Sequence, residues 1–187
     1  MTKANHTESG EIILIDLEDR QIGTCEKLRT HREHRLHRAF SLFLVNPDGQ
    51  MLLQQRAEGK YHSGGLWCNA CCSHPRAGEA LAEAVPRRAA EELGCSVPQA
   101  EELFQFVYYQ DYGDLAEYEL DHVFLAQAAG PFSPDPEEIQ ALRWIAPAEL
   151  EAELLAHPDR FAAWFLIAAP RVLQMLRSRQ DGGGQRS

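Results

Sequence analysis

Histidines with spacings that suit a metal ion occur in two parts of the chain. His31, His34 and His37 lie within seven residues, and His74 follows in the run Cys71-Cys72-Ser73-His74-Pro75. Imidazole combined with carboxylate is a ligand set typical of zinc, manganese or iron. A single histidine of this set is more often a surface residue than a ligand, so the hypothesis depends on the group.

Two glutamates could complete such a site. Glu117 and Glu119 are two residues apart in a segment that alternates like a strand, and Asp121 continues the row. Residues i and i+2 of a strand point to the same face. Carboxylates on one face repel each other unless a cation or a shared proton lies between them. The alternative is an acidic stripe that faces water.

A further carboxylate pair lies near the end of a predicted helix over residues 78–93. Glu91 and Glu92 are followed by Gly94, which is typical of a helix C-terminus. Adjacent carboxylates there could hold a hard cation that bridges to a diphosphate, although a solvated acidic helix face is equally consistent with the spacing. Pro86 predicts a kink or a shifted start of this helix.

Three of the five cysteines, Cys68, Cys71 and Cys72, fall within five residues. An odd number of cysteines favours free thiols. With no second CxxC motif, a zinc site of four thiolates is disfavoured. A redox pair, a reactive thiol of lowered pKa or a set of buried, inert thiols stay open.

Basic residues could bind a phosphorylated ligand in an otherwise acidic chain. The candidates are Lys27, Arg56, Lys60 and Arg88. Basic side chains that converge on a pocket hold phosphate groups, whereas each one alone can be a solubilising surface residue.

The elements that must position these residues alternate between strands and helices. Strands are predicted at 12–17, on both sides of the NPDG turn within 39–57, and at 103–109, 117–126 and 139–145; helices are predicted at 78–93, 147–156 and 159–178. Residues 59–78 read as irregular. Mixed strands flanked by helices predict an α/β sandwich.

Length and composition narrow the function classes. The chain has 187 residues and a formal net charge of −10, which disfavours binding to nucleic acid or to anionic membranes. We expect a single domain over 11–178, a flexible N-terminus over 1–10 and a disordered tail over 179–187. No apolar run is long enough to span a bilayer and the N-terminus is polar, so we expect a soluble, cytoplasmic monomer.

Read together, these segments resemble one family, the type 1 isopentenyl-diphosphate delta-isomerases of the Nudix superfamily. The resemblance covers about residues 10–178 and is carried by GTCEKLRTHREHRLHRAFS, LLQQRA, GLWCNACCSHP, RRAAEELG and EYELDHVF. It implies a Nudix-type α/β/α sandwich (α+β) with a mixed sheet. Two residues depart from the general Nudix box: Ser73 stands at its opening glycine, and Arg88 stands where Nudix hydrolases commonly carry a metal-binding glutamate.

The resemblance also implies roles for individual residues. A zinc or manganese site would be formed by His31, His37, His74, Glu117 and Glu119, with His34 as the alternative to His31. Glu92 would bind a magnesium ion that arrives with the substrate, and Lys27, Arg56, Lys60 and Arg88 would contact the diphosphate. The catalytic set would be Cys72, Glu119, Tyr108 and Trp164, with Tyr109 as the alternative to Tyr108.

The implied reaction is the reversible isomerisation of isopentenyl diphosphate to dimethylallyl diphosphate through a tertiary carbocation. It needs an acid, a base on the opposite face of the alkene and shelter for the cation. We expect Glu119 with Tyr108 to be the acid and Cys72 the base, although the two roles could be exchanged, and the Trp164 indole to stabilise the cation. The alternatives are a Nudix hydrolase of a nucleoside or prenyl diphosphate and a zinc-holding or redox-sensing binding module.

Overall fold

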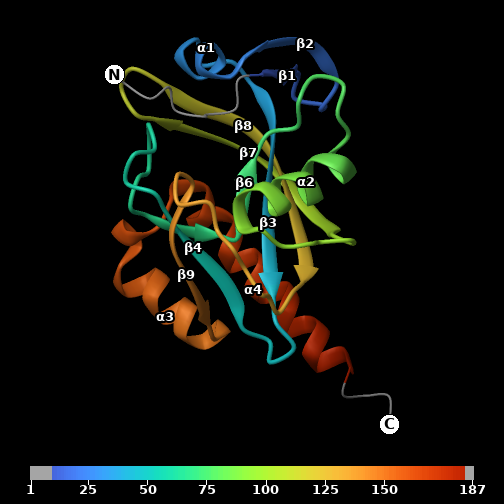
Figure 1. The fold of residues 1–187 in the computed structure, drawn as a ribbon, viewed down its shortest axis with the longest axis vertical. Helices are drawn as coiled ribbons and strands as arrows, with labels where there is room; N and C mark the ends of the chain where they lie inside the picture. The colour runs from blue at the N-terminus through green and yellow to red at the C-terminus, as the bar shows by residue number, and fades with distance from the viewer. Residues whose placement is uncertain (1–9, 184–187) are drawn as a thin grey trace.

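The computed structural model describes residues 10–183, in which nine strands form one mixed sheet (Figure 1). The strands are β1 (Glu11–Ile15), β2 (Gln21–Glu26), β3 (His37–Val45), β4 (Met51–Arg56), β5 (Trp67–Asn69), β6 (Cys71–Ser73), β7 (Glu101–Asp111), β8 (Ala116–Gln127) and β9 (Ile139–Ile145). The helices are α1 (Lys27–Arg32), α2 (Leu81–Leu93), α3 (Pro147–Ala156) and α4 (Ala163–Gly183), with a single 3-10 turn at Pro158–Arg160.

Strand β3 is the centre of the sheet. It pairs in parallel with β8 from His37 opposite Glu119 to Val45 opposite Gln127. On its other side it pairs antiparallel with β6, and β7 continues the sheet beyond β8. Such long, almost wholly buried strands are typical of a sheet that is covered on both faces.

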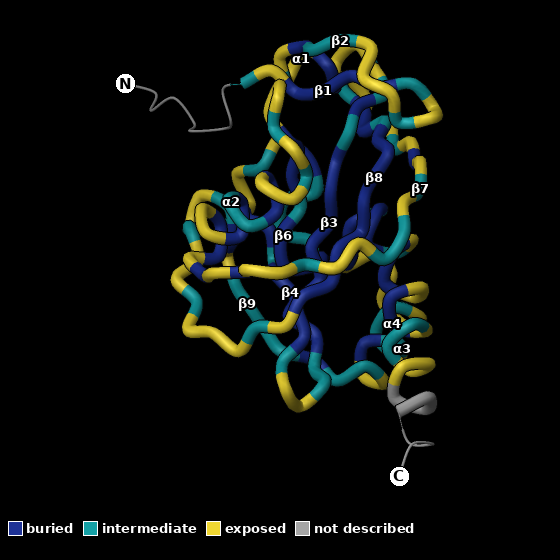
Figure 2. The backbone as a smooth tube through the Cα atoms, turned by 90° about the vertical axis from the view of Figure 1, so that its right-hand side faces the viewer, coloured by how far each residue is buried: buried dark blue, intermediate teal, exposed yellow. Residues whose placement is uncertain are grey.

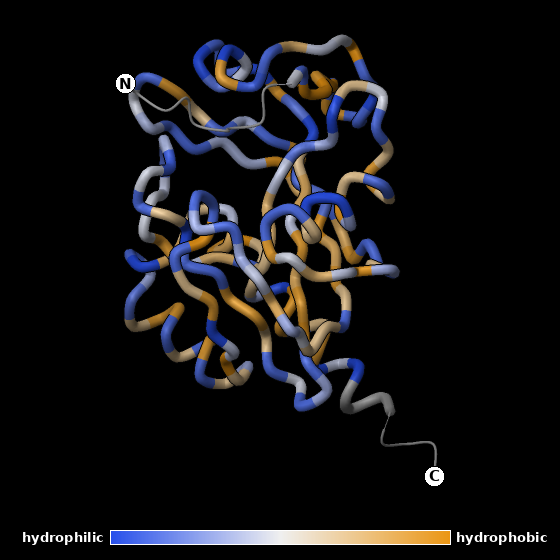
Figure 3. The backbone as a smooth tube through the Cα atoms, in the orientation of Figure 1, coloured by the Kyte–Doolittle hydropathy of each residue, from blue (hydrophilic) through white to orange (hydrophobic). Residues whose placement is uncertain are grey.

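Helices cover both faces of the sheet, as the sandwich prediction requires. Figure 2 shows α2 on one side of the central strands and α3 and α4 on the other. The α4 side is packed around Phe43, Val123 and Phe165, and the α2 side around Leu42, Leu44 and Leu93. The central strands are correspondingly the most apolar part of the chain in Figure 3. The predicted α+β sandwich with a mixed sheet is confirmed.

Several boundaries differ from the predictions. Helix α2 begins at Leu81 rather than at Gly78 and continues through Pro86, which forgoes one backbone hydrogen bond. Segment 59–78, predicted as irregular, contains the short strands β5 and β6, because both pair with longer strands.

At the C-terminal end, α4 continues to Gly183, so part of the predicted disordered tail is helical. In that extension Arg179 forms a two-pronged ion pair with Glu101. Residues 1–9 and 184–187, where the rest of the predicted flexible ends falls, lie outside the described part of the chain. Among residues 10–183, none of the helices has the length and apolar content needed to cross a membrane.

Candidate functional site

The site is built on one face of the β3–β8 pair. Along β8, Glu117, Glu119 and Asp121 point to the same face as Val123, which belongs to the apolar core under α4. The strand therefore changes from polar to apolar along a single face. Register also places Tyr108 of β7 and His37 of β3 on either side of Glu119, so that the three residues form a row across three strands.

Four metal-ligating groups meet at this row. One donor atom from each of His31, His37, His74 and Glu119 lies within 4.8 Å of the other three, and all four residues are buried. Glu119 Oε1 is 3.2 Å from His37 Nε2 and 2.9 Å from His74 Nε2. Three imidazoles and a carboxylate from α1, β3, β8 and the segment after β6 thus converge on one point.

Hydrogen bonds orient two of these imidazoles with one nitrogen toward the centre. His31 Nδ1 is 2.7 Å from the Lys27 carbonyl oxygen, and His37 Nδ1 is 2.8 Å from the Arg35 carbonyl oxygen. A carbonyl can only accept, so each Nδ1 carries a proton and each Nε2 is the nitrogen that faces the cluster. His31 Nε2 is buried and has no hydrogen-bond partner among the described residues. Outer hydrogen bonds of this kind are typical of metal-binding histidines.

Electrostatics also favours a cation here. Burial lowers the pKa of His31 to about 3, with help from His37 and His74, and lowers the pKa of His74 to about 4. Burial alone would raise the pKa of Glu119, but the neighbouring imidazoles of His37 and His74 outweigh it and hold that pKa well below its usual range. Neutral imidazoles beside an ionised carboxylate are the protonation states that a divalent cation requires.

Helix α1 is short, and its start is fixed by a side chain. The Glu26 carboxylate accepts hydrogen bonds from the backbone N–H groups of Leu28 and Arg29. This cap orients the single turn that carries His31 inward. His34, the predicted alternative to His31, instead lies at the exposed end of the turn, where its Nδ1 is 3.0 Å from the Tyr109 hydroxyl.

Glu117 lies next to this cluster but has other partners. Its Oε1 is 3.1 Å from His62 Nε2, and its Oε2 accepts a hydrogen bond from the Tyr112 hydroxyl at 3.0 Å. Ser63 Oγ is 3.2 Å from His62 Nδ1 and 3.1 Å from the Tyr112 hydroxyl, which closes a ring of four side chains. Burial and the charge of Glu119 raise the pKa of Glu117 well above its usual range.

Cys72 and Trp164 contact each other and the side chain of Asn69. The Trp164 indole N–H points at both Asn69 Oδ1, at 3.1 Å, and Cys72 Sγ, at 3.2 Å. The Cys72 thiol donates to Asn69 Oδ1 at 3.1 Å. Burial raises the pKa of Cys72 well above its usual range, so the unliganded site holds a thiol. The Arg56 guanidinium carbon lies 5.2 Å from the Trp164 ring centroid, which shows that a cation fits against this ring.

Tyr108 contacts the second carboxylate oxygen of Glu119. Its hydroxyl donates to Glu119 Oε2 at 2.6 Å. Burial and the charges of Glu117 and Glu119 raise the pKa of Tyr108 well above its usual range. Tyr109, the alternative from the sequence, points to the opposite, exposed side of β7.

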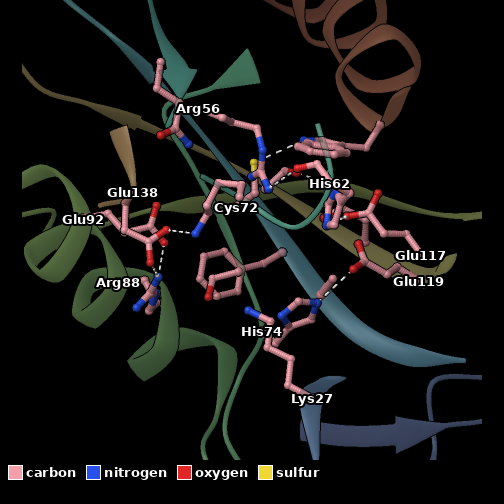
Figure 4. Close-up of a pocket in the computed structure, with 18 of the residues that line it drawn as sticks. Lys27, Arg56, His62, Cys72, His74, Arg88, Glu92, Glu117, Glu119 and Glu138 are labelled. Carbon is pink, nitrogen blue, oxygen red and sulfur yellow. Dashed lines mark hydrogen bonds and ion pairs between the residues drawn. The ribbon is translucent and has the colours of Figure 1, made fainter. Parts of the chain in front are cut away.

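Cations and carboxylates gather on the other side of the pocket (Figure 4). Arg88 forms ion pairs with Glu92 and, at 2.9 Å, with Glu91, and Lys60 pairs with Glu138. Figure 4 places Arg88, Glu92 and Glu138 across the pocket from Glu117 and Glu119, with Cys72 between them. The site is therefore a pocket with a metal-ligating end and a cationic end.

The structure brings the predicted residues together. The pocket is lined by the predicted residues Lys27, Arg56, Lys60, Cys72, His74, Arg88, Glu92, Tyr108, Glu117, Glu119 and Trp164, and His31 and His37 join it through the cluster. Sequence reasoning missed His62, Tyr112, Asn69 and Glu138. Two of them gave a signal: His62 lies in the same Gly- and Cys-rich stretch as the predicted residues, and Asn69 lies within the run GLWCNACCSHP that carries the resemblance.

The two nearby histidines provide a matched test of the metal cluster. We expect His31→Ala to weaken binding of Zn²⁺ or Mn²⁺ by more than the roughly 10–100-fold that loss of an outer hydrogen-bond partner costs, because a ligand itself is removed. His34→Ala should leave the affinity within about twofold of the wild type. Isothermal titration of each metal into the chelator-treated protein measures both, and equal effects of the two variants would contradict the assignment.

Comparison with known proteins agrees with this geometry. A family model described as NUDIX domain matches residues 35–165. The isopentenyl-diphosphate Delta-isomerase of Burkholderia multivorans is 46% identical over 82% of this chain and 88% of its own length, and that of Streptomyces coelicolor is 43% identical over 93% and 92%.

Solved structures add evidence on the fold. The DR0079 protein of Deinococcus radiodurans superposes with a TM-score of 0.72 at 21% identity, covering 86% of this chain and 98% of that one. A MutT NUDIX hydrolase from Burkholderia pseudomallei gives 0.61 at 25% identity, over 74% and 98%. Because the fold, the family model and relatives that match most of the chain all agree, the chain belongs to the isopentenyl-diphosphate Delta-isomerase family of NUDIX-domain proteins.

Proposed function

We propose that this protein is an enzyme that reversibly isomerises isopentenyl diphosphate to dimethylallyl diphosphate. The observation that carries the proposal is a single pocket in which a buried metal-ligating cluster and an acid–base group face a cationic end. The curated relatives that share 39–46% identity carry the same name, isopentenyl-diphosphate Delta-isomerase. A soluble, cytoplasmic monomer stays our prediction for its state in the cell.

The diphosphate serves as a handle in this proposal and is not cleaved. Lys27, Arg56, Lys60 and Arg88 all line the pocket and would hold it by charge and hydrogen bonds. Its binding energy would position the reacting carbons at the other end of the substrate. Glu92, buried beside Arg88, is our proposed ligand for the magnesium ion that accompanies the diphosphate.

Hydrolysis of a diphosphate is the less supported alternative. Nudix hydrolases use a cluster of carboxylates to hold catalytic magnesium, and Arg88 occupies one of those positions here. In the structure Arg88 is buried and paired with Glu92, so a fixed positive charge lies where hydrolysis would need a further carboxylate. This charge supports diphosphate binding and disfavours attack of a metal-activated water.

Proton transfer would be carried out by Glu119 and Cys72. Glu119 is linked to the Tyr108 hydroxyl, through which its second oxygen is held and oriented. Cys72 lies between Glu119 and the cationic end of the pocket, held by Asn69 and Trp164. Since the reaction is reversible, each group must both give and take a proton, and the order depends on the direction. Excluding water from the site strengthens the electrostatic interactions between these groups and a developing carbocation.

The metal cluster fits Zn²⁺ or Mn²⁺ with His31, His37, His74, Glu119 and, after a shift of its side chain, Glu117 as ligands. When bound, such an ion would act as a Lewis acid that polarises the carboxyl of Glu119. The Trp164 indole would shelter the carbocation, with a stabilisation of roughly 0.5–2 kcal/mol from its quadrupole. Its two hydrogen bonds fix the ring for that role.

Proton NMR in deuterated water tests the proposal. Metal-loaded protein incubated with isopentenyl diphosphate should produce the methyl signals of dimethylallyl diphosphate, with deuterium incorporated and the diphosphate intact. Cys72→Ala and Glu119→Gln should each lower the rate by at least about a thousandfold, since each removes a proton-transfer group. Cys95→Ala, a buried cysteine outside the pocket, is the control. Activity that survives both changes, or released phosphate with unchanged alkene, would overturn the proposal.

The ring around Glu117 generates a further expectation. His62→Ala removes one of the two side chains that orient this carboxylate, so we expect a loss of about 10–100-fold in isomerase rate or in Zn²⁺ affinity, as for other outer partners of a metal site. His62→Asn keeps a donor near Glu117 and should recover part of the loss. His157→Ala, on the exposed surface, is the control. Equal effects of the Ala and Asn changes would show that His62 acts by packing alone.

A further inference from the structure

Glu138 lies at the cationic end of the pocket although nothing in its sequence context marks it. It is the residue immediately before β9, where Ile139 pairs with Arg56 of β4. Its carbonyl accepts a hydrogen bond from the Ala57 backbone N–H at 3.0 Å. The backbone on either side is thereby fixed, and the side chain, 15% exposed, is directed into the pocket.

The Glu138 carboxylate is held by the residues that would bind the diphosphate. Oε2 forms an ion pair with Lys60, and Oε1 lies 3.7 Å from Arg88 Nη2. Burial alone would raise the pKa of Glu138, but Lys60 and Arg88 outweigh it, with a smaller contribution from Lys27. Three of the four proposed diphosphate-binding residues therefore act on this one carboxylate, which occupies the place of an anionic ligand.

Glu92 adds a second negative charge at the same place. Glu92 forms its ion pair with Arg88 Nη2, the same nitrogen that faces Glu138. The charge of Glu138 is also one of the causes that raise the pKa of Glu92. The carboxylates of Glu92 in α2 and of Glu138 before β9 thus share the guanidinium of Arg88 in the pocket.

This arrangement treats two forms of diphosphate differently. A metal-free diphosphate must replace Glu138 as the partner of Lys60 and Arg88. Its phosphate groups then lie beside the carboxylates of Glu92 and Glu138, and this repulsion between like charges weakens binding. A magnesium complex carries much less negative charge, and the cation itself offsets the carboxylates. We propose that Glu138 is a specificity-determining residue that makes the pocket accept the magnesium complex of a diphosphate and reject the metal-free anion. The inference rests on the proposed function, whose diphosphate site it refines.

Pyrophosphate binding measured by isothermal titration tests the inference without the isomerase reaction. The wild type should bind pyrophosphate far more tightly with excess Mg²⁺ than without added Mg²⁺. In Glu138→Gln, affinity for the metal-free anion should rise by about tenfold or more, because a buried like charge is removed. Affinity for the magnesium complex should change by less than about threefold, so the ratio of the two affinities falls.

Three variants separate charge from packing. Glu137→Gln changes the adjacent, exposed carboxylate and should keep the wild-type ratio. Glu138→Asp keeps the charge in the pocket and should retain most of the discrimination. Glu138→Ala should lower the ratio as Glu138→Gln does, and it replaces that variant if circular dichroism shows that Glu138→Gln is misfolded.

Four results would overturn the inference. An unchanged ratio in Glu138→Gln and Glu138→Ala, or an equal gain for both forms of pyrophosphate, would show that Glu138 does not discriminate. Loss of binding of the magnesium complex alone would make Glu138 a magnesium ligand instead. A wild type that binds neither form would refute the diphosphate site itself, whereas an inactive isomerase with the expected binding ratios would refute only the proposed function.

Discussion

The parallel pairing of β3 with β8 is the constraint on which the rest of the site depends. Because His37 lies opposite Glu119, a shift of one residue in either strand would turn the side chain of that strand to the other face of the sheet and separate the two. The same register places Val123 and Phe43 against α4, so the apolar core and the metal-ligating cluster are fixed by one set of backbone hydrogen bonds. Core packing thereby stabilises an arrangement of polar groups that would otherwise be unfavourable.

The two ends of the pocket differ in the charged groups that they gather. At one end, carboxylate oxygens and imidazole nitrogens converge, and a divalent cation could satisfy them. At the other end, lysine and arginine side chains converge and are paired with Glu92 and Glu138. Cys72 lies between the two ends (Figure 4), and its Sγ is 3.2 Å from the Trp164 indole nitrogen.

Much of this site could be predicted because its residues carry local signals. Period-two alternation placed Glu117 and Glu119 on one face of a strand, and the acidic end of a helix indicated Glu92. The choice of His31 over His34 came from the resemblance, and it agrees with the structure, in which His31 is buried in α1 whereas His34 lies beyond the end of that helix, half-buried beside Tyr109. Element boundaries were less predictable, since β5 and β6 are strands only because of the partners they pair with. Glu138 gave no signal, because its role arises from contacts with residues distant in sequence.

X-ray absorption at the zinc edge of the Zn²⁺-loaded protein tests the central claim most directly. That claim is that the metal-ligating end of the pocket is made of imidazole and carboxylate groups. The account predicts a shell of nitrogen and oxygen ligands at about 2.0–2.2 Å with outer-shell scattering from imidazole rings, and no sulfur. A sulfur shell at about 2.3 Å would place the metal on the cysteines instead and would contradict the account.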